Sequence, residues 1–263
     1  MAQDHRLQPQ RFELKYLIKN RIVTPLRDFV SAYLELDDFS VGKPNNSYEI
    51  HSVYLDSFGL DTHHATVNGD KNRYKLRLRY YDGAAGSPVF CEIKQRIDNS
   101  ILKKRAPVPR DIVPMVIAGQ LPPPEQLLSR EPRHYAALQR FIELSQRLNA
   151  QPRLHNHYLR EAWVSPHDNS IRVTLDRNIE VEPYFGNLAI TTMTNPVRIY
   201  REFVVLELKF TGRYPNWFNT LVSRFNLMRG AAMKYSGGVS SIGEQFFQRH
   251  EPEWEMQAAF RMN

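Results

Sequence analysis

The segment KLRLRYY, residues 75–81, alternates cationic and apolar side chains, and this alternation strongly constrains what the chain can fold into. A period of two places successive side chains on opposite faces of a β-strand. The two faces are Lys75, Arg77 and Arg79 on one side, and Leu76, Leu78 and Tyr80 on the other. A row of leucines on a strand is normally buried, so the cations line either open solvent or an enclosed anionic site.

The same alternation returns in other segments and favours the enclosed site. These segments are Glu13–Lys15, Glu92–Lys94, Arg172–Asp176 and Val204–Phe210. In each of them charged residues lie two apart on one face while aliphatic residues fill the other. A sheet face that meets water more often mixes uncharged polar residues among its charges, so a cavity lined by charge is the better interpretation.

The pattern of strands and helices indicates the fold class. Strands are predicted at residues 11–18, 48–56, 73–81, 89–96, 100–106, 154–165, 171–176 and 202–211, and helices at 24–36, 135–148 and 215–225. Residues 177–200 have only a weak pattern. Because the strands do not alternate regularly with helices, we predict an α+β fold with an antiparallel eight-stranded β-barrel and flanking helices. The expected organisation is a disordered N-terminus (1–10), one barrel domain (11–240) and a C-terminal helical tail (241–263).

Charge narrows the class of partner. The chain of 263 residues has a formal net charge of +7 and a pI near 9.5, which favours an anionic partner. The basic residues alternate inside strands and do not cluster on a helix or loop, and no aromatic RNA-binding motif is present. We therefore do not expect nucleic acid to be the partner.

Several absences in the sequence bear on location and on how a phosphate could be held. Cys91 is the single cysteine, no apolar run approaches the roughly 20 residues that span a bilayer, and the polar start lacks the apolar middle of a secretory signal. We expect a cytoplasmic protein. No glycine-rich phosphate loop and no Cys/His spacing typical of a zinc site is present, so a bound phosphate would be held by side chains.

A barrel of about eight strands has room inside for side chains or one small ligand. Each desolvated charge there costs several kcal/mol without a counter-ion. Inorganic triphosphate, the tail of a nucleoside triphosphate, or polyphosphate would supply that counter-charge to Arg and Lys. Acidic residues in the same lining would suit a hard divalent cation that bridges phosphate oxygens.

An ordered set of motifs resembles the VTC polyphosphate polymerase domain of the CYTH-like triphosphate tunnel metalloenzymes. The motifs are FELKYLI, KLRLRYY, EIKQR followed by ILKKR, YLREAW, IRVTLDR, VLELKF and MKYSGG, and the resemblance covers about residues 11–240. It implies a tunnel of antiparallel strands, a bound triphosphate or polyphosphate, and Mn²⁺ or Mg²⁺. The implied reaction transfers the γ-phosphoryl group of ATP onto a growing polyphosphate chain.

The resemblance also implies roles for particular residues. The expected catalytic residues are Lys15, Arg77, Arg79, Lys94, Arg160 and Arg172. The expected phosphate ligands are these six together with Lys75, Lys103, Lys209 and Lys234, with Lys104 as an alternative to Lys103. Glu207 takes the metal-ligand position, with Glu13 and Glu92 as further candidates. Glu207 could instead form an ion pair, either with Lys209 or with an arginine of the lining. Glu13 and Glu92 could instead orient the arginines.

Other functions stay open at this stage. Hydrolysis of triphosphate in the same tunnel, and non-catalytic binding of polyphosphate or a nucleotide by a sensor, would use many of the same residues. Eukaryotic members of the family carry a regulatory SPX domain and a membrane anchor, neither of which is recognised in this sequence. A membrane protein partner that replaces the anchor, at the inner face of the membrane, is a further hypothesis, and the oligomeric state stays open.

Two histidine pairs, His63-His64 and His155-x-His157, invite interpretation as metal ligands. The alternation around the second pair places Tyr158 and Arg160 on the opposite face of the strand from both imidazoles. We therefore regard metal binding by the histidines as the less favoured interpretation.

Overall fold

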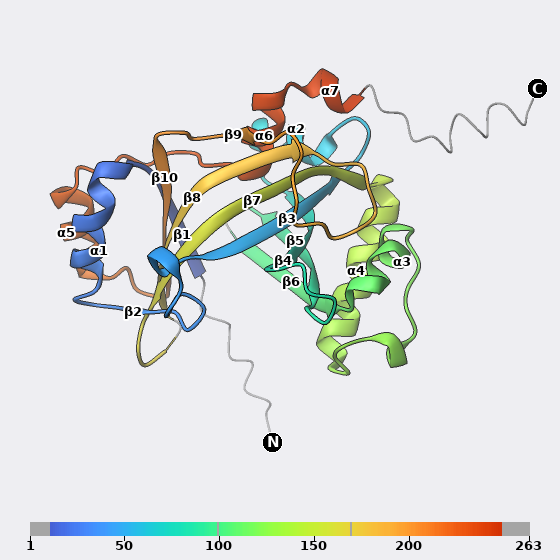
Figure 1. Cartoon of the computed structure of the whole chain (residues 1–263), viewed down its shortest axis with the longest axis horizontal. Coiled ribbons are helices and arrows are strands. Elements are labelled where there is room, and N and C mark those ends of the chain that lie inside the picture. Colours follow the sequence, from blue (N-terminus) through green and yellow to red (C-terminus); the bar gives the residue numbers. More distant parts are fainter. Residues whose placement is uncertain (1–10, 99, 169, 249–263) are drawn as a thin grey trace, which may run out of the picture. The chain divides into compact units, whose positions relative to one another are not determined.

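A computed structural model describes residues 11–98, 100–168 and 170–248 (Figure 1). The predictions for residues 1–10 and for most of the helical tail, residues 249–263, lie outside these ranges. The chain forms two compact units that interleave along the sequence. The first unit contains the residues up to Glu49, Tyr158–Ile179 and Tyr200–Ala232; the second contains Ile50–His157, Glu180–Ile199 and the described residues from Met233 on.

The strands confirm the predicted fold class. Their order is β1-β10-β8-β7-β3-β4-β5-β6, with β2 paired to β7 and β9 paired to β8. The strands are β1 (Arg11–Lys19), β2 (Glu35–Leu36), β3 (Tyr48–Asp56), β4 (Arg73–Tyr80), β5 (Val89–Ile97), β6 (Ser100–Val108), β7 (Gln151–Val164), β8 (Ile171–Pro183), β9 (Val197–Arg198) and β10 (Phe203–Thr211). The predicted α+β class, with eight strands on an antiparallel path and flanking helices, is therefore correct.

The first unit buries the aliphatic face of β10 under two helices, α1 (Val23–Val30) and α5 (Asn216–Arg224) (Figure 1). β10 pairs antiparallel with β1 on one side and with β8 on the other. Leu206 and Leu208 are fully buried with Leu26 of α1 and Phe218 of α5. The opposite face of β10 carries Glu207 and therefore belongs to the charged side of the sheet.

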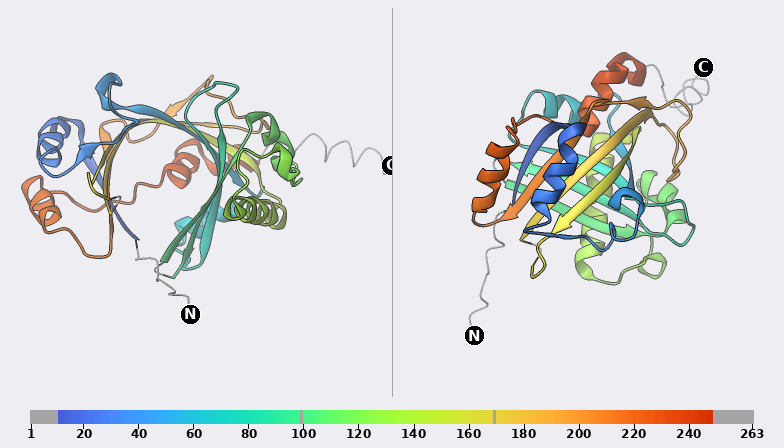
Figure 2. Two further views of the ribbon diagram at one scale, coloured as in Figure 1. Left: turned by 90° about the horizontal axis from the view of Figure 1, so that it is seen from below. Right: turned by 60° about the vertical axis from the view of Figure 1, so that its left-hand side comes forward.

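The second unit contains the antiparallel meander β3-β4-β5-β6, and its apolar face packs against two helices, α3 (Val113–Ile117) and α4 (Pro132–Leu148). Figure 2 shows α4 packed beside this meander, where it contacts β5 and β6. Leu76, Leu78 and Cys91 are buried there with Phe141 of α4. The predicted core position of Cys91 is confirmed, and so is the burial of the leucines between the cations of β4.

The helix predicted at residues 24–36 is wrong at its C-terminal end. α1 ends at Val30, and the amides of Tyr33 and Leu34 both donate to the Val30 carbonyl. The next residues, Glu35 and Leu36, form β2 and pair with the end of β7. A long-range strand pairing therefore overrides the helical periodicity of this segment.

Some short elements were not predicted. α2 (Asp61–Val67) lies in the segment between β3 and β4 that has a polar, turn-rich sequence. α6 (Lys234–Ile242) contains paired glycines, which are poor helix formers. The helix that follows it, α7 (Glu244–Gln248), lies within the predicted helical tail (241–263). β8 continues beyond its predicted end at Asp176, although it contains Asn178, a residue type that is rare in strands. These elements form because tertiary packing overrides weak local propensities.

Among the residues that the structure describes, no helix is both long enough and apolar enough to cross a membrane.

A matched pair of leucines tests which face of the meander forms the core. Leu78 of β4 is fully buried, whereas Leu102 of β6 has 49% of its surface exposed. Leu78→Ala should lower the free energy of unfolding by about 2–5 kcal/mol, because it leaves a cavity in the core. Leu102→Ala should lower it by less than about 1 kcal/mol. Urea unfolding measures both, and equal losses in the two variants would contradict this description of the core.

Candidate functional site

One face of β4, β5 and β6 in the second unit carries a dense set of cations, which we call the cation face. The strand register places Arg73 opposite Arg96, Lys75 opposite Lys94, and Arg77 opposite Glu92. The pairing of β5 with β6 adds Lys103 next to Lys94 and Arg105 next to Glu92. The cation face consists of Arg73, Lys75, Arg77, Arg79, Lys94, Arg96, Lys103 and Arg105, with Glu92 as the carboxylate of these three strands.

The register settles the choice between Lys103 and Lys104. Lys103 lies opposite Lys94 and therefore on the cation face, whereas Lys104 lies opposite Ile93, on the other face. The sequence predicts Lys103 first, with Lys104 as an alternative, because periodicity alone does not determine the register of β6.

Glu92 neutralises the centre of the cation face. Its side chain is 1% exposed and its carboxylate lies 2.6 Å from Arg77 and 2.7 Å from Lys103, with Arg105 at 3.5 Å and Arg79 at 3.9 Å. Burial alone would raise the pKa of Glu92, but Arg77, Arg79 and Lys103 outweigh burial and lower the pKa well below its ordinary value. Glu92 therefore stays ionised and holds the guanidinium and ammonium groups in place.

The surplus of positive charge is visible at Tyr54, which lies opposite Arg77 on β3. The guanidinium of Arg77 donates to the Tyr54 hydroxyl at 3.3 Å. Burial would raise the pKa of this hydroxyl, but Arg77, Arg79 and Lys75 outweigh burial and lower it to about 8. A phenol that ionises this readily indicates an environment that favours negative charge.

α6 lies beside the same face. The Lys75 ammonium is 3.4 Å from the Ser236 hydroxyl, and the Tyr235 ring stacks on Tyr54 with centroids 4.9 Å apart. The Tyr235 hydroxyl donates to buried Asp56 at 2.7 Å, which fixes the start of α6 to the end of β3. Lys234, the first residue of α6, is buried and is therefore not an exposed loop residue.

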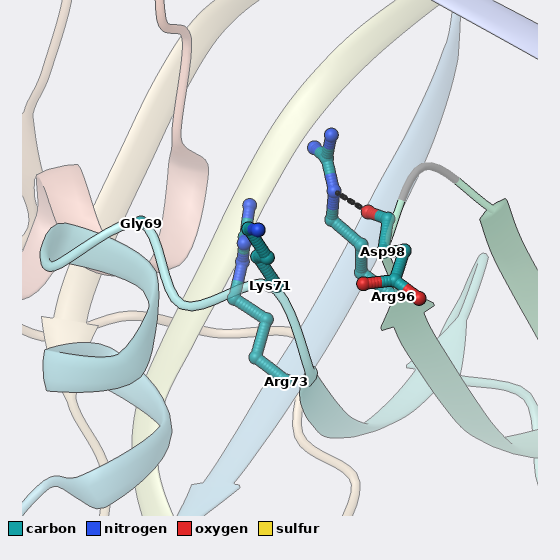
Figure 3. A pocket seen from close by; sticks show the side chains of 5 residues that line it. All are labelled: Gly69, Lys71, Arg73, Arg96 and Asp98. Atoms are coloured by element: carbon teal, nitrogen blue, oxygen red, sulfur yellow. Dashed lines mark hydrogen bonds between the residues drawn. The ribbon is translucent and has the colours of Figure 1, made fainter.

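The cation face ends in a shallow pocket lined by Gly69, Lys71, Arg73, Arg96 and Asp98 (Figure 3). Arg96 donates from its Nε to the Asp98 carbonyl at 2.9 Å, so its guanidinium keeps further donors. Burial and then the charge of Arg96 lower the pKa of Arg73. Like charges directly opposite each other in a sheet repel, so an anion at this pocket would be favourable.

The first unit contains a second charged group of residues, which we call the Glu207 cluster. Its members are Glu13, Lys15, Arg160, Arg172, Asp176, Glu207 and Lys209. In contrast to the cation face, this set is close to electrically balanced.

Glu207 lies at the centre of this cluster and is 4% exposed. Its carboxylate contacts Lys209 at 2.5 Å, Lys15 at 3.3 Å and Arg160 at 3.5 Å. Burial lowers the pKa of Lys209 to about 8, although Glu207 acts in the opposite direction. The ion pair with Lys209 that the sequence offered as an alternative is therefore present.

Lys15 joins Glu207 to Glu13. Its ammonium lies 3.1 Å from Glu13 and 3.3 Å from Glu207, so a cation already occupies the space between these two carboxylates. Hard divalent cations prefer such carboxylate oxygens, and the donor set therefore fits Mg²⁺ or Mn²⁺.

Asp176 was not among the predicted site residues. It is completely buried and binds the Arg160 guanidinium in bidentate fashion, at 2.6 and 2.7 Å. Burial lowers the pKa of Arg160, but Asp176 together with Tyr158 and Glu207 outweighs burial and raises the pKa well above its ordinary value. The signal for Asp176 was available, because Arg172, Thr174 and Asp176 alternate on one face of β8.

Arg172 lies at the edge of the Glu207 cluster. It pairs with Asp37 at 2.9 Å and donates to the Tyr48 hydroxyl at 3.3 Å. Every predicted phosphate ligand thus lies in one of two sets: Lys15, Arg160, Arg172 and Lys209 in the first unit, and Lys75, Arg77, Arg79, Lys94, Lys103 and Lys234 in the second. Their roles remain predictions.

The low pKa of Tyr54 can be measured directly. A pH titration of tyrosinate absorbance should show one tyrosine ionising near pH 8, well below the ordinary value of about 10. Tyr54→Phe keeps the ring and should remove this step, whereas Tyr33→Phe, a change in the first unit, should not. A step of the same size in the Tyr54 variant would mean that the cation field does not act on this hydroxyl.

The cation face and the Glu207 cluster both lie in a part of the chain that is similar to a known protein family. Curated protein sequences returned no match to the chain. The sequence profile of the VTC domain matches residues 10–242, which include both clusters. This family is associated with polyphosphate chemistry, and the density of cations on β4–β6 fits such a polyanion. The chain belongs to the VTC domain family.

Proposed function

We propose that this protein is a polyphosphate polymerase that transfers the γ-phosphoryl group of ATP onto a growing inorganic polyphosphate chain. The observation that carries the proposal is the cation face of β4–β6, where a single buried carboxylate, Glu92, stands among eight cations. Such a surplus of fixed positive charge calls for a ligand with several negative charges close together. Family membership supports phosphate chains over other polyanions.

Arg77 and Arg79 are the side chains best placed to grip phosphate. Their backbone positions are set by Leu76, Leu78 and Tyr80, which are all fully buried on the opposite face of β4. Guanidinium groups bind phosphate oxygens in bidentate fashion, and an ammonium such as that of Lys94 acts as a point charge. Because the buried core fixes the backbone from which Arg77 and Arg79 extend, the phosphate would bind to a preorganised site.

Glu207, with Glu13, would hold Mn²⁺ or Mg²⁺ in the first unit. When bound, the ion would neutralise charge that develops on the transferring phosphoryl group. Lys15, Lys209 and Arg160 now contact Glu207 and would exchange this carboxylate for phosphate oxygens. Glu92 has a different role in the proposal, because its contacts with Arg77 and Lys103 suit it to orienting cations.

Phosphoryl transfer of this kind depends on positioning and on charge stabilisation, so the proposal requires no protein nucleophile. Asp176 acts here as a positioning residue. It holds the Arg160 guanidinium in a fixed plane, and the Nη2 group that donates to Asp176 also donates to Glu207 at 3.5 Å.

Removing one guanidinium tests phosphate binding. Arg77→Gln and Arg79→Gln should each weaken tripolyphosphate binding about 10- to 100-fold, since a charge-assisted hydrogen bond contributes about 1.5–3 kcal/mol. Calorimetric titration measures the affinity. Arg133→Gln removes the same charge from a side chain that is 77% exposed, and should leave the affinity unchanged. Unchanged affinity in both Arg77 and Arg79 variants would place the phosphate elsewhere.

Glu207→Gln separates catalysis from binding, because it keeps the shape of the side chain and removes its charge. With ATP and Mn²⁺, the parent protein should form polyphosphate that resolves on a gel, and the variant should form at least 10-fold less. Tripolyphosphate binding should survive in the variant, because the cation face of β4–β6 is unchanged. Polymerisation at the parent's rate in the variant would remove Glu207 from the mechanism. Orthophosphate as the sole product of the parent would instead favour a triphosphatase, and binding without turnover would favour a sensor.

A further inference from the structure

Two histidines and a glutamate in the second unit converge outside both charged clusters. His63 and His64 are neighbours on α2, and Glu244 is the first residue of α7. The Nε2 atom of His63 lies 3.0 Å from one carboxylate oxygen of Glu244, and the Nε2 atom of His64 lies 3.5 Å from the other. One ligand atom from each residue lies within 4.8 Å of the other two.

From this geometry we propose a binding site for Zn²⁺, or a similar transition metal ion, formed by His63, His64 and Glu244. Zn²⁺ binds imidazole nitrogen and carboxylate oxygen at about 2.0–2.2 Å, so ligand atoms around a tetrahedral ion are about 3.3–3.5 Å apart. The two contacts of Glu244, at 3.0 and 3.5 Å, already lie close to this spacing. These contacts go to different oxygens of Glu244, and the three ligand atoms lie within 4.8 Å of one another, so they would draw closer together to bind an ion.

The approach of two neighbouring imidazoles to one carboxylate needs a particular arrangement of the rings and of the backbone. Consecutive side chains on an α-helix point about 100° apart, so two neighbouring histidines do not ordinarily reach the same carboxylate. Here the rings are nearly perpendicular, at 72°, with centroids 5.1 Å apart. The left-handed backbone at Leu60 (φ 61°) precedes α2, and Gly243 (φ 103°) directly precedes Glu244. These turns bring the two helix starts together.

The scaffold of the site is rigid. The Asp56 carboxylate accepts hydrogen bonds from the backbone amides of Thr62 and His63, at 2.9 and 3.0 Å, and from the Thr62 hydroxyl at 2.8 Å. His63 is completely buried, whereas the side chains of His64 and Glu244 are 43% and 41% exposed. An ion can therefore reach the site from solvent and bind against a fixed inner ligand.

The donor set separates this site from the metal proposed at Glu207. Two imidazoles and one carboxylate suit Zn²⁺, whereas Mg²⁺ prefers oxygen ligands alone. Three protein ligands also leave a fourth position open. The same carboxylate, Asp56, anchors both α2 and Tyr235 of α6, so a metal that ties α7 to α2 would stabilise the part of the chain that carries Lys234.

The test is calorimetric titration of chelator-treated, desalted full-length protein with Zn²⁺ in millimolar Mg²⁺. The parent should bind one ion tightly at this site, and the ion should raise the melting temperature. His64→Ala and Glu244→Gln change exposed side chains, and each should weaken this binding at least 10-fold and abolish the thermal shift. His167→Ala removes an exposed histidine from a loop and should change neither quantity.

The variants must first be compared without metal. An unchanged urea midpoint in chelator identifies variants that are folded, and either His64→Ala or Glu244→Gln alone is sufficient for the test. Co²⁺ in place of Zn²⁺ gives visible absorption bands that should disappear in the same variants. Absence of tight binding in the parent, or equal affinity in the parent and a folded variant, would overturn the proposal. Equal weakening in the His167 variant would also overturn it.

Discussion

A buried carboxylate, Glu92, allows the second unit to assemble its cation face before any ligand binds. Cations that share one face of a sheet repel one another, and the repulsion grows as water is removed. Glu92 is 1% exposed and lies within 2.7 Å of both Arg77 and Lys103. Arg77, Arg79 and Lys103 outweigh burial and lower the pKa of Glu92 well below its ordinary value, so the counter-charge is present at neutral pH. On these three strands one carboxylate stands against eight cations, and this surplus of positive charge favours an anionic ligand.

The core and the site are two sides of the same strands. Leu78 is fully buried between Arg77 and Arg79 along β4, and a shift of the strand by one residue would exchange the apolar and the cationic faces. Packing against α3 and α4 therefore fixes the register, and the register fixes where each guanidinium lies. The same holds in the first unit, where Leu206 and Leu208 pack under α1 and α5 on either side of Glu207.

The charged groups differ in the kind of ligand they favour. The cation face of β4–β6 has a large surplus of positive charge and favours phosphate. The Glu207 cluster is nearly balanced, and in the proposed function its carboxylates would hold a divalent cation while its lysines bind phosphate. The group formed by His63, His64 and Glu244 contains nitrogen donors and favours a softer metal ion. Charge balance and donor type thus distinguish the three ligand classes that we propose.

Alternation along single strands was enough to predict much of the fold and of the candidate site. The spacing of Arg77 and Arg79, and that of Glu207 and Lys209, places these residues on one face of a strand whatever the rest of the chain does. By contrast, the end of α1 at Val30 depends on a pairing of Glu35 with Val164, which local sequence does not contain. α6 likewise depends on a long-range contact, because its Tyr235 donates to Asp56, which is 179 residues earlier in the sequence.

The sequence by itself determined which side chains share a strand face, because the period of a strand is a local property of the backbone. Only the tertiary structure decided which faces lie side by side. It placed Lys103 rather than Lys104 next to Lys94, gave Arg160 its bidentate partner Asp176, and brought Glu244 to the histidines of α2. Strand register and long-range ion pairs depend on the packing of the whole core, and local periodicity carries no information about either.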